Sequence, residues 1–242
     1  MNEYEDFARR QQRTRLLVGD EKLERLRRAH VLVLGVGGVG AYAAEQLARA
    51  GIGTLTLVDG DRFELTNCNR QLPALTSTLG RPKAEVVAER MREINPAGNY
   101  FPRVEFLQGD GIDRLLETRF DFAVDAIDSL TPKVEFLLGC LRRNIPVVSS
   151  MGSGGKVDPS LIQVADISKT HGCALARAVR TRLRAAGVTR GIRTVFSPEA
   201  VPPEAVLAWK DEAGHHHSTV GTVSYLPAIF GCVCASVVLR AL

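Results

Sequence analysis

Short apolar runs alternate with amphipathic stretches along the first two thirds of the chain. The first of these runs, Val31-Leu-Val-Leu34, has no hydrophobic–polar alternation, which is typical of a strand buried on both faces of a parallel sheet. We therefore predict strands at residues 31–34, 54–58, 104–107, 122–126 and 146–150. The intervening periodicity predicts helices at residues 7–28, 41–50, 83–93 and 131–143. This order predicts an α/β fold: a Rossmann-like, doubly wound, mostly parallel sheet with helices on both faces.

The last third of the chain has a different pattern. We predict strands at 161–165 and 193–196, a helix at 175–186 between them, and an irregular segment at 199–221. Residues 215–239 contain no Asp, Glu, Lys or Arg. The run ends in the apolar stretch 229–239, which is short for a membrane span of about 20 residues, and Gly221, Pro227 and Gly231 interrupt it. We interpret its end as a buried core helix, with membrane association as the lesser alternative.

Composition indicates the cellular compartment of the protein and the kinds of partner it could bind. The chain has 242 residues and a formal net charge of +4, which permits a polyanionic partner without requiring one. Its five cysteines are irregularly spaced, which fits a reducing compartment better than a disulfide framework. The first 15 residues lack the apolar core of a signal peptide. We predict a cytoplasmic protein with no stable membrane insertion.

A glycine-rich loop follows the first predicted strand and opens the first predicted helix. Gly35, Gly37, Gly38 and Gly40 permit a tight turn and a close backbone approach, and the helix N-terminus supplies N–H donors, as a phosphate site requires. Asp59 ends the next strand about 20 residues on, where a carboxylate binds a ribose hydroxyl. The motif alone does not separate NAD from ATP, so an NAD-dependent oxidoreductase stays open here.

Three further side chains follow the carboxyl ends of successive predicted strands. Arg70 and Lys83 are suited to neutralise charge on a leaving pyrophosphate, and Asp128 is suited to hold magnesium. Taken singly, the cations are equally well explained as surface charges and Asp128 as a helix cap. Their order and location together indicate a nucleotidyl-transfer site that uses ATP and Mg²⁺, which a dehydrogenase does not need.

The motifs resemble the adenylation core of the ubiquitin-activating-enzyme superfamily, which includes the ThiF and MoeB proteins. The matching segments are Gly35-Val-Gly-Gly-Val-Gly40, Asp59-Gly-Asp61, Asn67-Cys-Asn-Arg-Gln71, Arg81-Pro-Lys83 and Asp125-Ala-Ile-Asp128. The resemblance implies that Asp59 binds ribose, that Asn67 and Arg70 bind phosphates, and that Lys83 binds phosphates and the transition state. It also places Asp61 and Ile127 in the nucleotide site and magnesium on Asp128.

The N-terminal segment indicates that the protein forms a homodimer. Arg10-Gln-Gln-Arg13 resembles the arginine motif that relatives insert into the partner subunit's site, which implies a homodimer with Arg10 and Arg13 acting in trans. The alternative for these arginines is a solvated basic helix. We accordingly divide the chain into a basic helical segment (1–30), an ATP-binding adenylation core (31–150) and a C-terminal extension (151–242) that completes the sheet and the substrate site.

The second half is similar to the bacterial tRNA threonylcarbamoyladenosine dehydratase family. The similar segments are residues 150–159, 164–170, 195–199 and 221–227, so this resemblance covers nearly the whole chain. It implies a ligase-type, carboxylate-adenylating enzyme that dehydrates threonylcarbamoyladenosine in tRNA through an acyl-adenylate. Residues 169–193 carry seven cations and no acid, which fits either a track for the tRNA phosphates or a solvated helix face.

The chain departs from its relatives at several positions. Zinc is not expected, because there is no Cys-x-x-Cys and the one close pair, Cys232 and Cys234, lies in an apolar run. Cys173-Ala174 replaces the Asp-Pro of the dehydratase pattern, which makes Cys173 a candidate nucleophile beside His171. The triplet 215–217 of histidines is a candidate metal site or a polar loop.

Two further functions stay open from the sequence. The first is an adenylyltransferase that activates the C-terminal Gly-Gly of a ubiquitin-like sulfur carrier with the same core residues. The second is a non-enzymatic scaffold that hands on sulfur or docks a cysteine desulfurase or sulfur acceptor.

Overall fold

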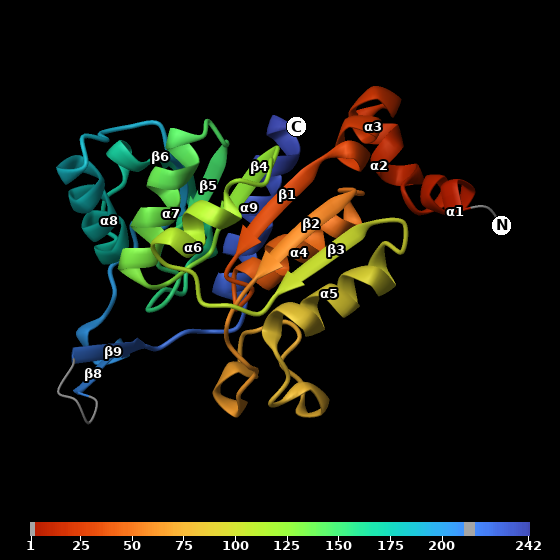
Figure 1. The fold of residues 1–242 in the computed structure, drawn as a ribbon. Coiled ribbons are helices and arrows are strands. Elements are labelled where there is room, and N and C mark those ends of the chain that lie inside the picture. The colour runs from red at the N-terminus through yellow and green to blue at the C-terminus, as the bar shows by residue number, and fades with distance from the viewer. Residues whose placement is uncertain (1–2, 211–215) are drawn as a thin grey trace.

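One seven-stranded sheet organises the chain, with the strand order β3-β2-β1-β4-β5-β7-β6 (Figure 1). The structure is a computed structural model that describes residues 3–210 and 216–242. Every neighbouring pair is parallel except β6 with β7. The strands are β1 (His30–Leu34), β2 (Thr54–Val58), β3 (Asn99–Arg103), β4 (Phe122–Asp125), β5 (Val147–Ser150), β6 (Gln163–Asp166) and β7 (Arg193–Phe196).

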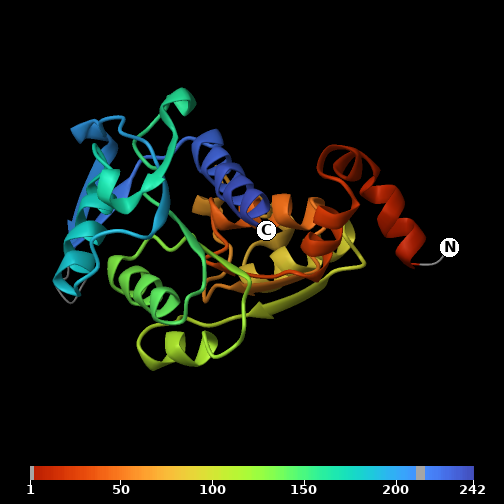
Figure 2. The same ribbon diagram turned by 90° about the horizontal axis from the view of Figure 1, so that it is seen from above.

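Helices cover both faces of this sheet (Figures 1 and 2). One face carries α4 (Gly40–Arg49), α5 (Lys83–Ile94) and α9 (Tyr225–Ala241), and their apolar side chains form one core cluster with the strands. The other face carries α6 (Asp110–Leu115), α7 (Leu130–Arg142) and α8 (Ala174–Ala185), which form a second cluster. The predicted Rossmann-like, doubly wound fold is therefore confirmed.

The strand order reverses between β1 and β4. The chain steps outward from β1 to β2 and β3, then returns to the other side of β1 for β4 and β5. In open α/β sheets ligands bind at the carboxyl ends of the strands beside such a switch point. The loops after β1, β2 and β4 are therefore where the fold provides a site.

The C-terminal helix closes the sheet beside that switch point. A Cβ on Gly231 of α9 would lie 2.3 Å from the carbonyl oxygen of Val39, so only glycine lets α9 pack this closely on the start of α4. Phe230, Cys234 and Val238 are buried, which confirms the predicted core helix, whereas Cys232 is exposed. Within the described ranges, no helix has the length and apolar character needed to cross a membrane.

The third strand lies at a different position from the one that the apolar pattern predicts. A strand at 104–107 is wrong: β3 lies at Asn99–Arg103 and pairs with β2 from Thr54↔Asn99 to Val58↔Arg103. Pro102 made this segment look unlike a strand, but β3 is an edge strand, where one side needs no hydrogen bond and proline is tolerated. The apolar residues after it are largely exposed, with Phe106 at 78%.

Two other segments differ from the sequence prediction. The single helix expected at 7–28 is three helices, α1 (Glu3–Arg10), α2 (Gln12–Val18) and α3 (Asp20–Arg28), with one break at Gln11 and a second at Gly19, where φ is +82°. The segment expected to be irregular contains an antiparallel hairpin of β8 (Val206–Lys210) and β9 (His216–Val220). These strands pair only with each other, so burial imposes no strong hydrophobic alternation on them.

Single 3₁₀ turns connect several of these elements. Within the described residues they lie at Leu65–Asn67, Thr76–Thr78, Pro159–Leu161, Ile167–Lys169 and Pro203–Ala205.

Candidate nucleotide-binding site

The glycine loop turns tightly from β1 into α4. Gly35 has a φ of +84°, and a Cβ on Gly40 would lie 1.8 Å from the Gly35 carbonyl oxygen. Side chains at either position would clash or strain the backbone, so both residues must be glycine. The turn brings the N-terminus of α4 to the carboxyl ends of the strands, where its free N–H groups can bind phosphate.

Asp59 fixes this loop to the end of β2. Its Oδ2 accepts a hydrogen bond from the backbone N–H of Val36 at 2.8 Å, and its Oδ1 accepts one from the N–H of Asp61 at 2.9 Å. Burial raises the pKa of the Asp59 carboxyl, while these N–H donors and nearby Lys83 act in the opposite direction. An ionised carboxylate offers about four lone-pair sites, so acceptor capacity remains for a ribose hydroxyl.

Gln71 is a residue that sequence reasoning did not assign to the site. Its side chain is 7% exposed, and its Oε1 is buried with no hydrogen-bond partner among the described residues. Its Nε2 lies 3.5 Å from where a Cβ on Gly37 would be. The second glycine of such loops is small so that phosphate can approach the backbone. The buried side chain beside Gly37, with an unpartnered carbonyl oxygen, makes Gln71 a candidate nucleotide contact.

We expect Gln71→Glu to weaken ATP binding about tenfold to a hundredfold, because it puts a negative charge beside the phosphates. Equilibrium titration with ATP measures the affinity. Gln163→Glu makes the same exchange at an exposed position of β6 and should leave the affinity unchanged. Equal affinities for both folded variants would remove Gln71 from the site.

Two cations stand at the same edge of the sheet. Lys83 is 6% exposed at the start of α5, and its Nζ donates to Asp61 Oδ2 at 2.8 Å. Arg70 is half-buried and donates only to neutral oxygens, Thr66 O at 3.0 Å and Asn69 Oδ1 at 2.9 Å. Since no carboxylate within the described residues neutralises Arg70, its charge is available to an anionic ligand.

Asn67 builds the turn that carries Arg70. It is buried, and its Oδ1 accepts a hydrogen bond from the backbone N–H of Glu64 at 3.2 Å. Its carbonyl oxygen accepts hydrogen bonds from the N–H groups of Arg70 and Gln71. The turn therefore places Arg70 beside Gly38 and Gln71 beside Gly37, while the Asn67 side chain holds the turn itself.

The loop after β4 completes the site. Asp128 is exposed just before α7, and its Oδ1 accepts a hydrogen bond from Ser129 Oγ at 3.2 Å. Ile127 is partly buried against the second core cluster. Beneath them, Asp125 and Lys133 form an ion pair in which both side chains are fully buried. Lys133 is a second residue that sequence reasoning missed, although it interrupts the apolar stripe of Phe136, Leu137 and Cys140 on α7.

These residues fit a nucleoside triphosphate with a divalent cation. The glycine loop, Gln71 and Arg70 supply donors, and Asp128 supplies one exposed carboxylate. Magnesium in such sites is held by one or two carboxylates together with the substrate phosphates. The described residues contain no group of three or more His, Cys, Asp or Glu side chains placed to hold a metal without a ligand's help.

Phe106 also borders the site without having been singled out from the sequence. It lies in the segment that connects β3 to α6, and its ring covers Gly60, where a Cβ would lie 2.6 Å from the ring. Gly60 directly follows the ribose candidate Asp59. An exposed aromatic face beside a ribose site is suited to pack against a base.

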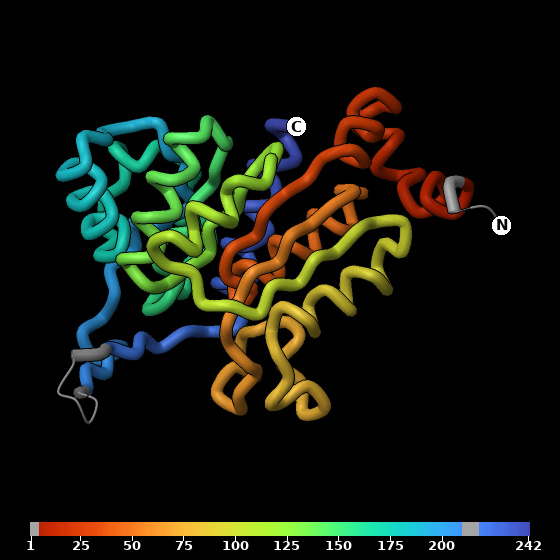
Figure 3. Tube along the Cα trace, viewed as in Figure 1, coloured from red at the N-terminus to blue at the C-terminus, as the bar shows by residue number. Residues whose placement is uncertain are grey.

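Arg10 and Arg13 are the predicted site residues that the fold keeps away. The side chain of Gln11 donates to the carbonyl oxygen of Arg49 at 2.9 Å, at the end of α4 opposite the glycine loop. The ten residues of α4 span about 15 Å. Figure 3 shows these N-terminal helices beyond the start of β1. The two arginines therefore do not reach the glycine loop of their own chain.

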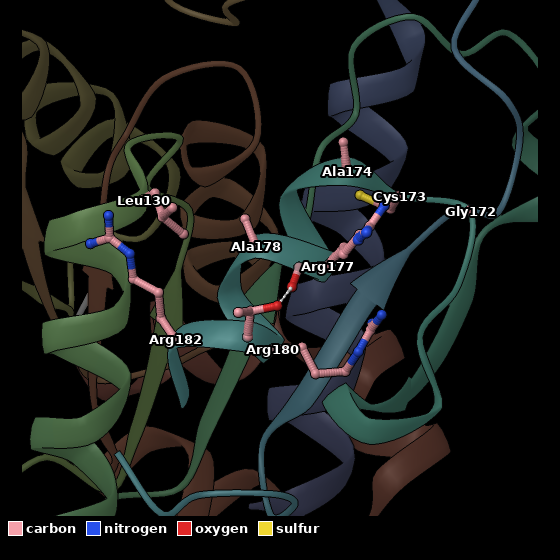
Figure 4. Close-up of a pocket in the computed structure, with 9 residues that line it drawn as sticks. Leu130, Gly172, Cys173, Ala174, Arg177, Ala178, Arg180 and Arg182 are labelled. Carbon is pink, nitrogen blue, oxygen red and sulfur yellow. Dashed lines mark hydrogen bonds between the residues drawn. The ribbon is translucent and has the colours of Figure 1, made fainter. Parts of the chain in front are cut away.

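A hollow lies between α7 and α8 (Figure 4), and its lining begins at Leu130, two residues after Asp128. It has a volume of about 600 Å³ and is lined by Leu130, Cys173, Arg177, Arg180 and Arg182 among others. Arg182 donates to Thr131 Oγ1 at 2.9 Å and so spans from α8 to α7. Cys173 is buried at the start of α8 and lines this hollow.

In the part of the chain that it describes, the structure gives no evidence that the candidate histidines take part in catalysis or bind a metal. The ring of His171 packs edge-on against Phe196, with ring centroids 5.5 Å apart, and its Nδ1 lies 3.3 Å from the carbonyl oxygen of Lys169. His215 lies outside the described residues, as do the side chains of the next two histidines.

Comparison with known proteins gives the family. The ThiF family matches residues 9–242. A tRNA threonylcarbamoyladenosine dehydratase of Bacillus subtilis is 44% identical over 188 residues, covering 78% of this chain and 74% of that protein. Its Escherichia coli counterpart is 40% identical over 243 residues, covering 94% and 91%. A crystal structure of the Escherichia coli dehydratase with ATP has a TM-score of 0.86 at 37% identity, covering 97% of this chain and 93% of that chain.

The chain therefore belongs to the ThiF family, which confirms the resemblance of the adenylation motifs. The likeness to the tRNA threonylcarbamoyladenosine dehydratases within that family is confirmed along nearly the whole chain. The sulfur carrier protein ThiS adenylyltransferase of Escherichia coli is 33% identical over 136 residues, which covers 55% of this chain and 54% of that protein. Similarity to the adenylyltransferase is thus limited to a shared part, whereas similarity to the dehydratases includes the C-terminal segment.

Proposed function

We propose that this protein is an enzyme that uses ATP to dehydrate threonylcarbamoyladenosine next to the anticodon of tRNA, forming a ring. The observation that carries the proposal is the similarity to a dehydratase over 94% of this chain, compared with 55% for the sulfur-carrier adenylyltransferase. The nucleotide site described above supplies the groups that such a reaction needs.

The reaction makes a poor leaving group into a good one. The threonyl carboxylate oxygen attacks the α-phosphorus of ATP, the bond to the β-phosphate oxygen breaks, and pyrophosphate leaves. The neighbouring carbamoyl group then attacks the activated carbonyl carbon and loses a proton, and AMP leaves with the carboxylate oxygen. The nucleophile is in the same molecule, so its effective concentration is high and no thiol such as Cys173 is required.

The side chains of the site divide this work. Asp59 accepts hydrogen bonds from the ribose, and Lys83 and Arg70 stabilise the charge that develops on the phosphates as pyrophosphate departs. Asp128 would hold the magnesium ion, which would supply charge neutralisation for the phosphates. The chain thus contributes positioning and charge stabilisation.

The tRNA has a cationic surface available beside this site. The ion pairs found in the described part of the chain all lie before residue 144, so none involves the seven cations of residues 169–193. Six of the seven are exposed, namely Lys169, Arg177, Arg182, Arg184, Arg190 and Arg193. Unpaired cations of this density bind a phosphate backbone through release of its counterions.

A homodimer would bring the N-terminal arginines to a site. In α2 no residue is buried, and Leu16 and Leu17 are 82% and 86% exposed. Exposed adjacent leucines on a helix mark a contact surface. Since Arg10 and Arg13 do not reach the glycine loop of their own chain, we propose that they act in the site of a second copy, as the arginine motif implies.

Mixed dimers should reveal this exchange. The double variant Arg10→Ala, Arg13→Ala and the variant Asp128→Ala should each be inactive alone. After unfolding and refolding together in equal amounts, they should recover about a quarter of wild-type activity, because half of the random dimers then contain one complete site. Arginines acting within their own chain would give no recovery beyond the two variants alone.

Exchange of labelled pyrophosphate into ATP tests which substrate is activated. We expect exchange with tRNA that carries threonylcarbamoyladenosine, and none with tRNA lacking it or with a sulfur carrier ending in Gly-Gly. The purified protein should need no desulfurase or sulfur acceptor, because the reaction consumes no sulfur. Exchange that depends on the carrier and ignores the tRNA would instead identify the adenylyltransferase function.

A further inference from the structure

A completely buried ion pair lies directly under the loop after β4. Asp125 is the last residue of β4 and Lys133 stands on the first turns of α7, and the side chains of both are 0% exposed. Lys133 Nζ donates to Asp125 Oδ2 at 2.8 Å, and Ser149 Oγ of β5 donates to the same oxygen at 2.5 Å. The pair thus joins two strands and a helix beneath the site.

The ion pair forms hydrogen bonds with the peptide groups on both sides of Ile127. The backbone N–H of Ile127 donates to Asp125 Oδ1 at 3.1 Å. The carbonyl oxygen of Ile127 accepts a hydrogen bond from Lys133 Nζ at 2.7 Å. Because both peptide groups that flank Ile127 are held, the next residue, Asp128, leaves the loop in a fixed direction.

Stability of the fold alone does not explain this arrangement. Removing two charges from water is so unfavourable that well-packed apolar side chains often replace a buried ion pair without loss of stability. The surroundings are apolar here, since Phe136, Leu137 and Cys140 on α7 are also buried. An apolar pair could not supply the hydrogen-bond acceptor and donor that hold the two peptide groups of Ile127.

We propose that Asp125 and Lys133 are positioning residues that set the orientation of Asp128 toward Mg²⁺ and ATP. The pair touches neither ligand and acts through the peptide groups of Ile127. This inference rests on the proposed ATP-dependent function for the role of Asp128, but not on the identity of the activated carboxylate. Partners of this kind behind a metal ligand typically change metal affinity about tenfold to a hundredfold.

The test removes both charges together. In the double variant Asp125→Asn, Lys133→Met, neither an unpaired buried charge nor a large cavity remains. We expect its melting temperature to stay near that of the wild type. We expect the Mg²⁺ concentration needed for half-maximal ATP binding to rise about tenfold or more, with a matching loss in the affinity for Mg-ATP. Calorimetric titration with ATP at a series of Mg²⁺ concentrations measures both.

Arg142→Gln is the matched control, because Arg142 lies on the same helix and pairs with Asp113 in an exposed ion pair. It should leave both quantities unchanged. Unaltered Mg²⁺ dependence in the folded double variant would overturn the proposal. An equal loss of ATP affinity with and without Mg²⁺ would also overturn it, since the pair would then support the site in general.

A second variant covers the case in which the first fails to fold. Asp125→Asn, Lys133→Gln keeps polar side chains for the Ile127 peptide groups without charge, and it should raise the Mg²⁺ concentration needed for half-maximal ATP binding above that of wild type and Arg142→Gln. A Mg²⁺ requirement equal to that of Arg142→Gln in this folded variant would count against the proposal. The titrations contain no tRNA, so wild-type protein that binds Mg-ATP but converts no tRNA would refute the proposed function while leaving this test intact.

Discussion

Replacing Lys83 with methionine should slow adenylation about a hundredfold to a thousandfold. The Lys83 ammonium is buried at the start of α5, 2.8 Å from Asp61 Oδ2, at the edge of the sheet where the phosphates would lie. A desolvated cation at that place stabilises the charge on departing pyrophosphate more strongly than a solvated one. Initial rates of pyrophosphate exchange at saturating ATP measure the loss.

The fold should tolerate this change, because Asp61 is half-exposed and remains solvated when its partner is removed. Arg81→Met is the control: Arg81 lies two residues earlier and forms an exposed ion pair with Glu89 at 2.6 Å. A folded Lys83→Met protein with a rate close to that of Arg81→Met would show that Lys83 serves only the local structure.

Asp128→Ala should abolish measurable adenylation while the protein stays folded. Asp128 is exposed and its side chain accepts a hydrogen bond only from the adjacent Ser129 within the described structure, so its removal costs little stability. It is also the carboxylate that would hold magnesium, which the departing pyrophosphate needs for charge neutralisation.

A matched exposed aspartate separates this effect from a change in surface charge. Asp110→Ala removes a carboxylate at the start of α6 and should leave the exchange rate unaltered. Near wild-type exchange in Asp128→Ala would mean that the metal ligand lies elsewhere.

The parts of the fold that burial determines were predictable from the sequence. The strands at the centre of the sheet are buried, and apolar residues predominate in β1, β2 and β4, while the turn itself imposes the spacing of the glycine loop. The position of β3 was not predictable in this way. An edge strand needs no continuous burial and tolerates proline, and β3 contains Pro102. The β8–β9 hairpin lies outside the main sheet, where the apolar pattern carries little information.

The candidate site shows the same division. Motif spacing predicted Asp59, Arg70, Lys83 and Asp128 as site residues, and in the fold the first three follow β2 and Asp128 follows β4, the two strands on either side of β1. Gln71 was quoted within a motif, but its unpartnered amide is visible only once the glycine loop is in place. Lys133 could have been suspected, because a lysine on the apolar stripe of a helix must find a buried partner.

The most direct test of the dehydratase function is mass spectrometry of the nucleosides from bulk bacterial tRNA incubated with this protein, ATP and Mg²⁺. We expect threonylcarbamoyladenosine to lose the mass of one water. The change should require ATP, and Arg70→Ala should prevent it. Unchanged threonylcarbamoyladenosine in the presence of active, ATP-binding protein would contradict the dehydratase function and leave the adenylation site in need of another carboxylate.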